Sequence, residues 1–156
     1  MTRIILLTIS HFAVLVIGFA AGVFFLPILT EEAAPEAAVL EAQAASAEYS
    51  AEFTRDLRGS DSLHWGEGAI SVSATSISHQ GKLAPGPDYK LYLIKGYVED
   101  EAGFEAIKAS AVRIGDVKSY RGFLLDVPQG VDVSEFNTVV IWCETFGEFI
   151  TAGQYR

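Results

Sequence analysis

The feature that most constrains this chain is its first apolar segment. No charged side chain lies between Ile4 and Leu29, whereas Arg3 precedes this segment and Glu31 follows it. As a helix the segment spans about 39 Å, which is enough to cross a hydrocarbon core of about 30 Å. It is also longer than the roughly 7–15 apolar residues of a cleaved signal peptide. We therefore expect residues 1–30 to form an uncleaved transmembrane signal anchor that contacts the lipid bilayer through residues 4–29.

The charges that flank this segment predict its orientation. Arg3 and the amino terminus lie ahead of it, and the acidic pair Glu31 and Glu32 lies behind it. Positive charge stays preferentially on the cytoplasmic side of a membrane. The amino terminus is thus expected in the cytoplasm and the remainder of the chain on the other side.

The apolar segment also carries a small-xxx-small spacing. Gly18 and Gly22 are separated by Phe-Ala-Ala. Small residues at this spacing let two membrane helices approach closely. The sequence therefore predicts a homodimer contact through Gly18 and Gly22.

Residues 31–50 differ from both of their neighbouring segments. They consist mostly of Ala and Glu, with Pro35 near the start. Ala and Glu favour helix after the proline, but no apolar stripe is wide enough to pack against a core. We expect an Ala/Glu-rich tether, which is either a semi-rigid helical stalk or a solvated, partly disordered linker.

Residues 51–156 have the pattern of one globular domain. Short apolar runs alternate with turns rich in Gly, Pro and Asp, and a single helical pattern covers residues 99–108. No strand–helix alternation of the kind that builds a parallel sheet is present. We therefore predict an all-β fold, an antiparallel β-sandwich with one short helical insertion. The expected strands include residues 70–74, 89–94, 123–127 and 139–143.

Composition excludes several classes of function. The formal net charge is −9 and no cluster of Lys and Arg is present, which argues against nucleic acid as a partner. The G-x-S-x-G elbow, the P-loop, the dinucleotide glycine pattern and H-E-x-x-H are all absent. The sequence therefore carries no catalytic signature, and it leaves open whether the protein is an enzyme.

Ligands for a metal or haem are few. His64 and His79 are the only histidines of the expected domain, and they lack the close ligand pairs typical of a metal site. Haem attachment by Cys-x-x-Cys-His needs two cysteines, and the only methionine is Met1. The sequence names no cofactor and no metal site. A haem would have to use Cys143, His64 or His79.

Cys143 is the only cysteine and ends a short apolar run. Side chains alternate along a strand, so Val139, Ile141 and Cys143 share one face while Val140 and Trp142 share the other. A single thiol forms no internal disulfide, and on the oxidising side of a membrane it is buried, bound to a group or paired with another chain. Cys143 is therefore the candidate redox thiol or ligand. The alternative is a buried packing residue.

Four blocks of sequence resemble a known family. They are residues 63–68 (LHWGEG), 84–93 (APGPDYKLYL), 127–132 (VPQGVD) and 139–156. In this order and spacing they are similar to the DM-thirteen domain, especially its membrane-anchored bacterial branch. The resemblance implies a domain proposed to take part in electron transfer, whose strand cysteine acts as a thiol or as the ligand of a prosthetic group. Carried onto this chain, that role falls on Cys143. His64 is a second candidate for binding a cofactor if the fold brings it near Cys143.

Two hypotheses of function follow. The first is a redox module anchored in the cell inner membrane, with the domain in the periplasm or outside the cell and an envelope redox or protein partner. The second is a non-catalytic envelope binding or structural module in which Cys143 only packs. A cysteine-nucleophile enzyme is a third reading, and it needs a histidine and an orienting carboxylate around Cys143.

Overall fold

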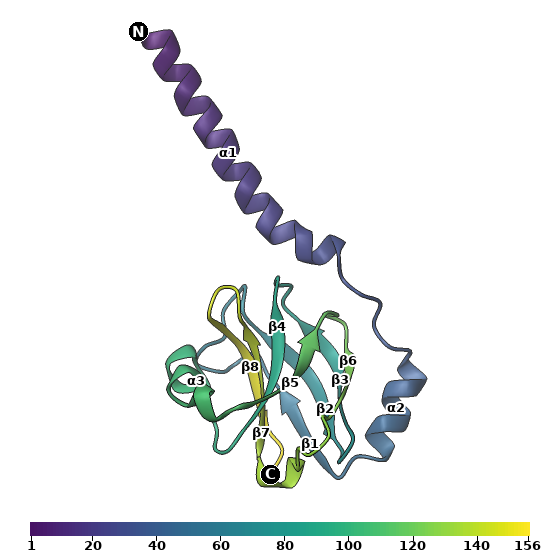
Figure 1. Cartoon of the computed structure of the whole chain (residues 1–156). Helices are drawn as coiled ribbons and strands as arrows, with labels where there is room; N and C mark the ends of the chain where they lie inside the picture. Colours follow the sequence, from purple (N-terminus) through teal and green to yellow (C-terminus); the bar gives the residue numbers. More distant parts are fainter.

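Eight strands form two antiparallel four-stranded sheets that face each other (Figure 1). The structure, a computed structural model, describes residues 1–156. One sheet has the order β1-β2-β3-β6 and the other the order β5-β4-β7-β8. The two sheets confirm the predicted β-sandwich. Their strands are β1 Tyr49–Phe53, β2 Gly66–Val72, β3 Ser76–Leu83, β4 Tyr89–Ile94, β5 Val112–Val117, β6 Phe123–Asp126, β7 Thr138–Cys143 and β8 Glu148–Gln154.

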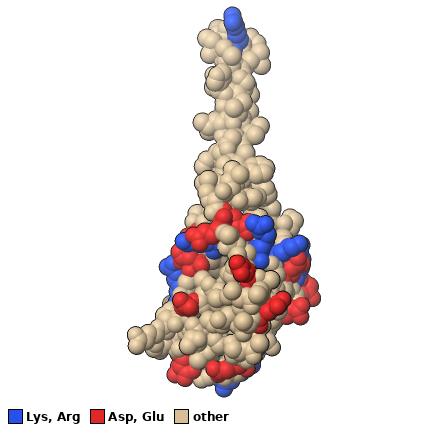
Figure 2. Space-filling model, turned by 90° about the vertical axis from the view of Figure 1, so that its right-hand side faces the viewer, with Lys and Arg blue, Asp and Glu red and all other residues tan.

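The apolar amino-terminal segment is one helix, α1, Thr2–Leu29. It is long and apolar enough to cross a membrane, and most of its large apolar side chains are exposed. Figure 2 shows that its shaft carries no Lys, Arg, Asp or Glu between its tip and the sandwich. A Cβ added at Gly18 or Gly22 meets no atom within 4 Å, so the face that carries both glycines is open.

The segment after α1 is not a free tether. Helix α2, Ala37–Ala45, packs against β2 and β3, and Leu40 is buried there. The Ser76 hydroxyl donates a hydrogen bond of 2.9 Å to Gln43 Oε1 on α2. Strand β1 begins at Tyr49, within the stretch expected to be linker. The sequence did not indicate this packing. Leu40 is the one buried residue of α2, and a single leucine does not form the apolar stripe by which a packed helix is predicted.

Two apolar clusters lie on opposite faces of the β5-β4-β7-β8 sheet. The larger cluster, which we call the inter-sheet core, holds 19 buried residues drawn from both sheets. The smaller one, the outer cluster, holds eight buried residues: six on the far face of β4, β7 and β8, together with Val98 and Phe104. Val139, Ile141 and Cys143 belong to the inter-sheet core, while Val140 and Trp142 belong to the outer cluster. The predicted alternation along β7 is therefore confirmed.

A short helix closes the outer cluster. Helix α3, Glu101–Ile107, and the 3₁₀ turn η1, Lys108–Ser110, lie between β4 and β5 in the chain. The Asp100 carboxylate accepts a 2.8 Å hydrogen bond from the Gly103 amide and so caps the first turn. Phe104 is fully buried against the rings of Tyr92 and Trp142. A second 3₁₀ turn, η2, Val133–Glu135, precedes β7.

Candidate functional site

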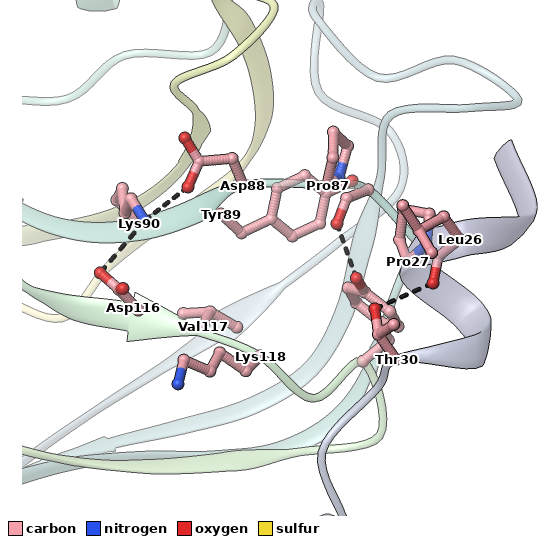
Figure 3. A pocket seen from close by; sticks show the side chains of 12 residues that line it. Leu26, Pro27, Thr30, Pro87, Asp88, Tyr89, Lys90, Asp116, Val117 and Lys118 are labelled. Carbon is pink, nitrogen blue, oxygen red and sulfur yellow. Dashed lines mark hydrogen bonds and ion pairs between the residues drawn. The ribbon is translucent and has the colours of Figure 1, made fainter. Parts of the chain in front are cut away.

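The loops at one end of the sandwich face α1 (Figure 1). They include the loop before β4 and the turn between β7 and β8. In Figure 3 the last turn of α1, with Leu26 and Pro27, lies beside Pro87 of the loop before β4. The Tyr120 hydroxyl donates a 2.6 Å hydrogen bond to the Gly86 carbonyl oxygen in the same region. This end of the domain is thus built against the end of α1.

Glu31 fixes the exit of the chain from α1. Its side chain is only 12% exposed and pairs with the Arg121 guanidinium at 3.3 Å. The same carboxylate accepts hydrogen bonds from the Tyr120 amide at 3.0 Å and from the Ser119 hydroxyl at 3.3 Å. The Glu32 amide donates to the Lys118 carbonyl oxygen at 3.0 Å. These contacts attach the start of the linker to the loop between β5 and β6.

Asp88 ties the loop before β4 to the β7–β8 turn. Its backbone carbonyl accepts a 3.0 Å hydrogen bond from the Glu144 amide, and its side chain accepts one of 3.3 Å from the Thr145 hydroxyl. Lys90 pairs with Asp88 and, at 3.2 Å, with Asp116 (Figure 3). The turn that follows Cys143 is therefore held in place from β4 and β5.

A cavity of about 530 Å³ lies between α1 and these loops. Its volume falls within the roughly 300–1,000 Å³ typical of small-molecule sites. Most of its lining residues are apolar, and both Cys143 and His64 are among them. The fold thus brings the two candidate site residues of the sequence to one cavity. The remaining lining residues are Phe19, Ala20, Val23, Phe24, Ser62, Leu63, Trp65, Ala84, Pro85, Gly86, Pro87, Tyr89, Phe146, Glu148 and Ile150.

Cys143 forms part of the cavity floor and is only 2% exposed. It lies at the end of β7, opposite Tyr89 on β4 and Glu148 on β8. Burial raises the pKa of the Cys143 thiol, and the neighbouring amides of Phe146, Asp88 and Thr145 offset part of this effect. A raised pKa keeps the group a neutral thiol at neutral pH. This disfavours the thiolate that a cysteine-nucleophile enzyme uses.

His64 is oriented by an acidic neighbour in its own loop. Its Nδ1 lies 3.1 Å from Asp61 Oδ2, while the Leu63 and His64 amides donate to Asp61 Oδ1 at 2.6 and 2.8 Å. The pKa of Asp61 is lowered, most of all by the Leu63 amide and further by His64 and its amide, which favours the carboxylate form. In the neutral ring, a carboxylate at Nδ1 favours the proton on that nitrogen, which leaves the lone pair on Nε2. No protein atom is bonded to Nε2.

His79, the other histidine of the domain, lies apart from the cavity. It is fully buried, and its ring packs between Phe53 and Phe123 with centroid separations of 5.2 Å to each. Nε2 lies 3.0 Å from the Glu67 carbonyl oxygen. Burial lowers the pKa of His79 to about 4, so the ring is neutral near pH 7. His79 is a core residue and is removed from the set of candidate haem ligands.

The cavity residues fit a group held by a single imidazole better than a metal cluster. No set of three or more His, Cys, Asp or Glu side chains is arranged to hold a metal ion. His64, with Nδ1 fixed by a carboxylate and Nε2 free, has the arrangement that orients a metal-binding histidine. Cys143 and His64 are the two residues that a haem in this cavity could use.

Several cavity residues were not predicted from the sequence. Asp61 lies three residues before His64, and this spacing is a local signal that could have identified the pair. Tyr89 and Glu148 reach the cavity through strand register, and Phe19 and Phe24 reach it from α1. No local pattern predicts such contacts, because they depend on how distant segments are placed.

Comparison with known proteins identifies the domain. Residues 56–155 match the family model described as electron transfer DM13, the DM-thirteen family that the sequence blocks resemble. No curated protein and no solved structure matches the chain. The matched residues cover most of the chain and all of the sandwich except β1. The chain therefore belongs to the DM13 electron-transfer family.

Proposed function

We propose that this protein is a membrane-anchored, extracytoplasmic redox module whose site is the cavity shared by Cys143 and His64. The observation that carries the proposal is the placement of the chain's only cysteine and an Asp61-oriented histidine in one cavity. Membership of a family described by electron transfer supports the same reading. The cofactor and the electron partner are not specified by these residues.

Anchoring is the first part of the proposal. A helix of 28 residues whose only charged residue, Arg3, lies in its first turn supports a signal anchor in the cell inner membrane, with the amino terminus in the cytoplasm. The domain then lies in the periplasm or outside the cell. The open face around Gly18 and Gly22 leaves room for a second helix, and self-association there stays a prediction.

The redox role is the second part. A haem, when bound, supplies one-electron transfer. His64 Nε2 would hold the iron, since its ring is fixed by Asp61 and the nitrogen has no protein partner. Cys143 lies on the same cavity as a neutral thiol, and most of the cavity's lining residues are apolar. An apolar surround of this kind affects the reduction potential of a bound group.

An envelope binding module is the second candidate function. The specific observation in its favour is that Cys143 is nearly inaccessible and has a raised pKa, as a packing cysteine has. In that case the cavity binds a ligand or partner without electron transfer. Cys143 is then one more member of the inter-sheet core.

One preparation tests both candidates. The full chain, purified in detergent from cells supplied with haem, is examined for visible absorbance and for the rate of alkylation of Cys143 in the folded state. The redox proposal expects a Soret band that is lost in His64→Ala, whose Nε2 would hold the iron, or, for a redox thiol without haem, a native thiol that is alkylated promptly. The surface variant Lys95→Ala is the control and keeps the wild-type spectrum. A chain with neither absorbance nor prompt alkylation contradicts the redox role and favours the binding module.

A further inference from the structure

The cavity has one wall that lies in the membrane-spanning helix. Phe19, Ala20, Val23 and Phe24 of α1 line it together with loops of the sandwich. Two of the few large apolar side chains that the domain itself exposes, Leu63 at 56% and Phe146 at 54%, lie on the same cavity. Exposed apolar side chains next to a membrane helix indicate a surface that meets lipid. With α1 anchored as proposed, these side chains lie near the bilayer surface, from which an apolar molecule can reach the cavity.

The walls of the cavity suit a flat ring rather than a flexible chain alone. Trp65, Tyr89 and Phe146 line it from the sandwich, and Phe19 and Phe24 line it from α1. The Arg55 guanidinium covers one face of the Trp65 ring, with its carbon 3.3 Å from the ring centroid. Aromatic rings pack against one another in offset or edge-to-face geometry, beyond the gain from apolar area. A saturated acyl chain does not gain from this geometry.

The polar groups of the cavity are mainly acceptors. In the neutral ring of His64, Asp61 at Nδ1 favours the proton on that nitrogen and leaves the lone pair on Nε2. The Glu148 carboxylate also lines the cavity, and it has no ion-pair or hydrogen-bond partner in the protein. The Tyr89 hydroxyl either donates or accepts. Two acceptors with an apolar surround are complementary to a ring that carries two hydroxyl donors.

From these observations we propose that the cavity between α1 and the sandwich binds a membrane-soluble quinol, a dihydroxylated aromatic ring with an apolar tail. One ring hydroxyl donates to His64 Nε2 and the other donates to the Glu148 carboxylate. The tail extends along α1 into the bilayer. Binding leaves the oxidation state of the ring unchanged. The inference rests on the proposed redox function, and in it the quinol takes the place of haem at His64 Nε2, because that nitrogen can hold only one of the two. A quinol is the electron-carrying molecule that a site at the bilayer surface can reach.

The test measures binding without any redox readout. The full chain carrying Trp142→Phe, which leaves Trp65 as the only tryptophan, is placed in phosphatidylcholine nanodiscs under anaerobic conditions. Trp65 emission is followed during titration with decylhydroquinone and, separately, with its dimethyl ether. The ether keeps the ring and tail but has no hydroxyl donor. Calorimetric titration of the unsubstituted chain gives an independent measurement in case Trp142→Phe impairs folding.

The proposal expects a saturable response to decylhydroquinone and binding of the ether that is at least about 10-fold weaker, since a lost hydrogen bond leaves a buried polar group unpaired. His64→Ala and Glu148→Ala should each weaken quinol binding by a similar factor. Ala20→Phe, which fills the cavity from α1, should abolish the response, and Ala21→Phe, the adjacent residue that does not line the cavity, should not.

Equal responses to the quinol and the ether would mean that the cavity accepts any apolar molecule, which overturns the proposal. Absence of any response overturns it as well. The result is separable from the proposed function. If the chain binds quinol but shows neither the absorbance nor the prompt alkylation, the quinol site stands and the redox roles of haem and Cys143 are contradicted. If the chain passes those tests but does not bind quinol, only the quinol site is contradicted.

Discussion

The two histidines of the domain occupy opposite kinds of environment. His79 is fully buried between Phe53 and Phe123, and His64 lines a cavity with a quarter of its side chain exposed. One is a neutral core residue and the other is an oriented imidazole with a free nitrogen. Residue type alone therefore does not mark a site in this fold. The neighbours supplied by other strands and loops decide it.

Trp142 and Cys143, which are adjacent on β7, show the same contrast between core and cavity. Trp142 and Cys143 are 1% and 2% exposed, so burial does not distinguish them. Trp142 faces the outer cluster, which α3 closes with Phe104. Cys143 faces the opposite way, at the end of the strand, where the core meets the cavity. The closed interior is expected to govern stability, and the cavity is expected to govern binding.

The largest expected effect is a loss of stability when Phe104, which closes the outer cluster, is replaced. Phe104→Ala removes a fully buried ring whose centroid lies 4.9 Å from that of Trp142 and 5.3 Å from that of Tyr92. The free energy of unfolding should fall by about 3–5 kcal/mol, measured by urea denaturation of the full chain in detergent. The control at the cavity rim, Leu63→Ala, should change it by no more than about 0.5 kcal/mol. Similar losses for both variants would contradict a division between closed core and open cavity.

The second prediction concerns pH and separates the two histidines. The pKa of His79 is lowered to about 4 in the folded state, from an ordinary value of 6.5. Between these values the unfolded chain binds the extra proton, so stability is fully present above pH 6.5 and is lost as pH falls toward 4. The loss should be on the order of 3 kcal/mol. It should largely disappear in His79→Gln and persist in His64→Gln, as followed by urea denaturation across this range. An unchanged pH dependence in His79→Gln would show that His79 is not buried as a neutral ring.

The third prediction asks whether the linker belongs to the closed part of the molecule. Glu31→Ala removes the acceptor of the Tyr120 amide and the partner of Arg121. Unpaired buried groups of this kind cost about 1–3 kcal/mol. Limited proteolysis should then cut faster between residues 30 and 50, whereas Glu41→Ala on the exposed face of α2 should leave the rate unchanged. Equal rates in both variants would return the segment to the free tether that its composition suggests.

The smallest expected effect is at Cys143 itself. Cys143→Ala removes only one sulfur atom from the floor of the cavity, so the free energy of unfolding should fall by about 1 kcal/mol. Val139→Ala, on the same face of β7 but inside the closed core, is the matched comparison and should cost more. An equal loss of unfolding free energy in Cys143→Ala and Val139→Ala would mean that the thiol packs as completely as Val139 does. It would weaken the assignment of Cys143 to the cavity.

The sequence was sufficient where a local pattern carries the information. The β4 strand matches its predicted residues 89–94, and β7 differs from its predicted range by one residue at its start. The alternating faces of β7 and the long apolar helix were predicted for the same reason, since a period of two and an uncharged run are both read along the chain. The family was also recognisable from four blocks of sequence.

Other features depended on tertiary structure. Helix α2 buries Leu40 alone, so its sequence has no apolar stripe that predicts packing. Glu31 binds residues that lie about ninety positions further along the chain. Likewise, only the tertiary structure placed His64 at the cavity and His79 in the core.

The sequence by itself thus determined which segments form the apolar helix and the main strands, because those choices follow from periodicity and from the cost of placing charge in an apolar environment. Only the tertiary structure decided that Cys143, His64, Glu148 and a wall of α1 surround one cavity. Such a site depends on register between strands and on loops held by hydrogen bonds such as that from Glu144 to Asp88. These are contacts between residues far apart in the chain, and no pattern within a single segment encodes them.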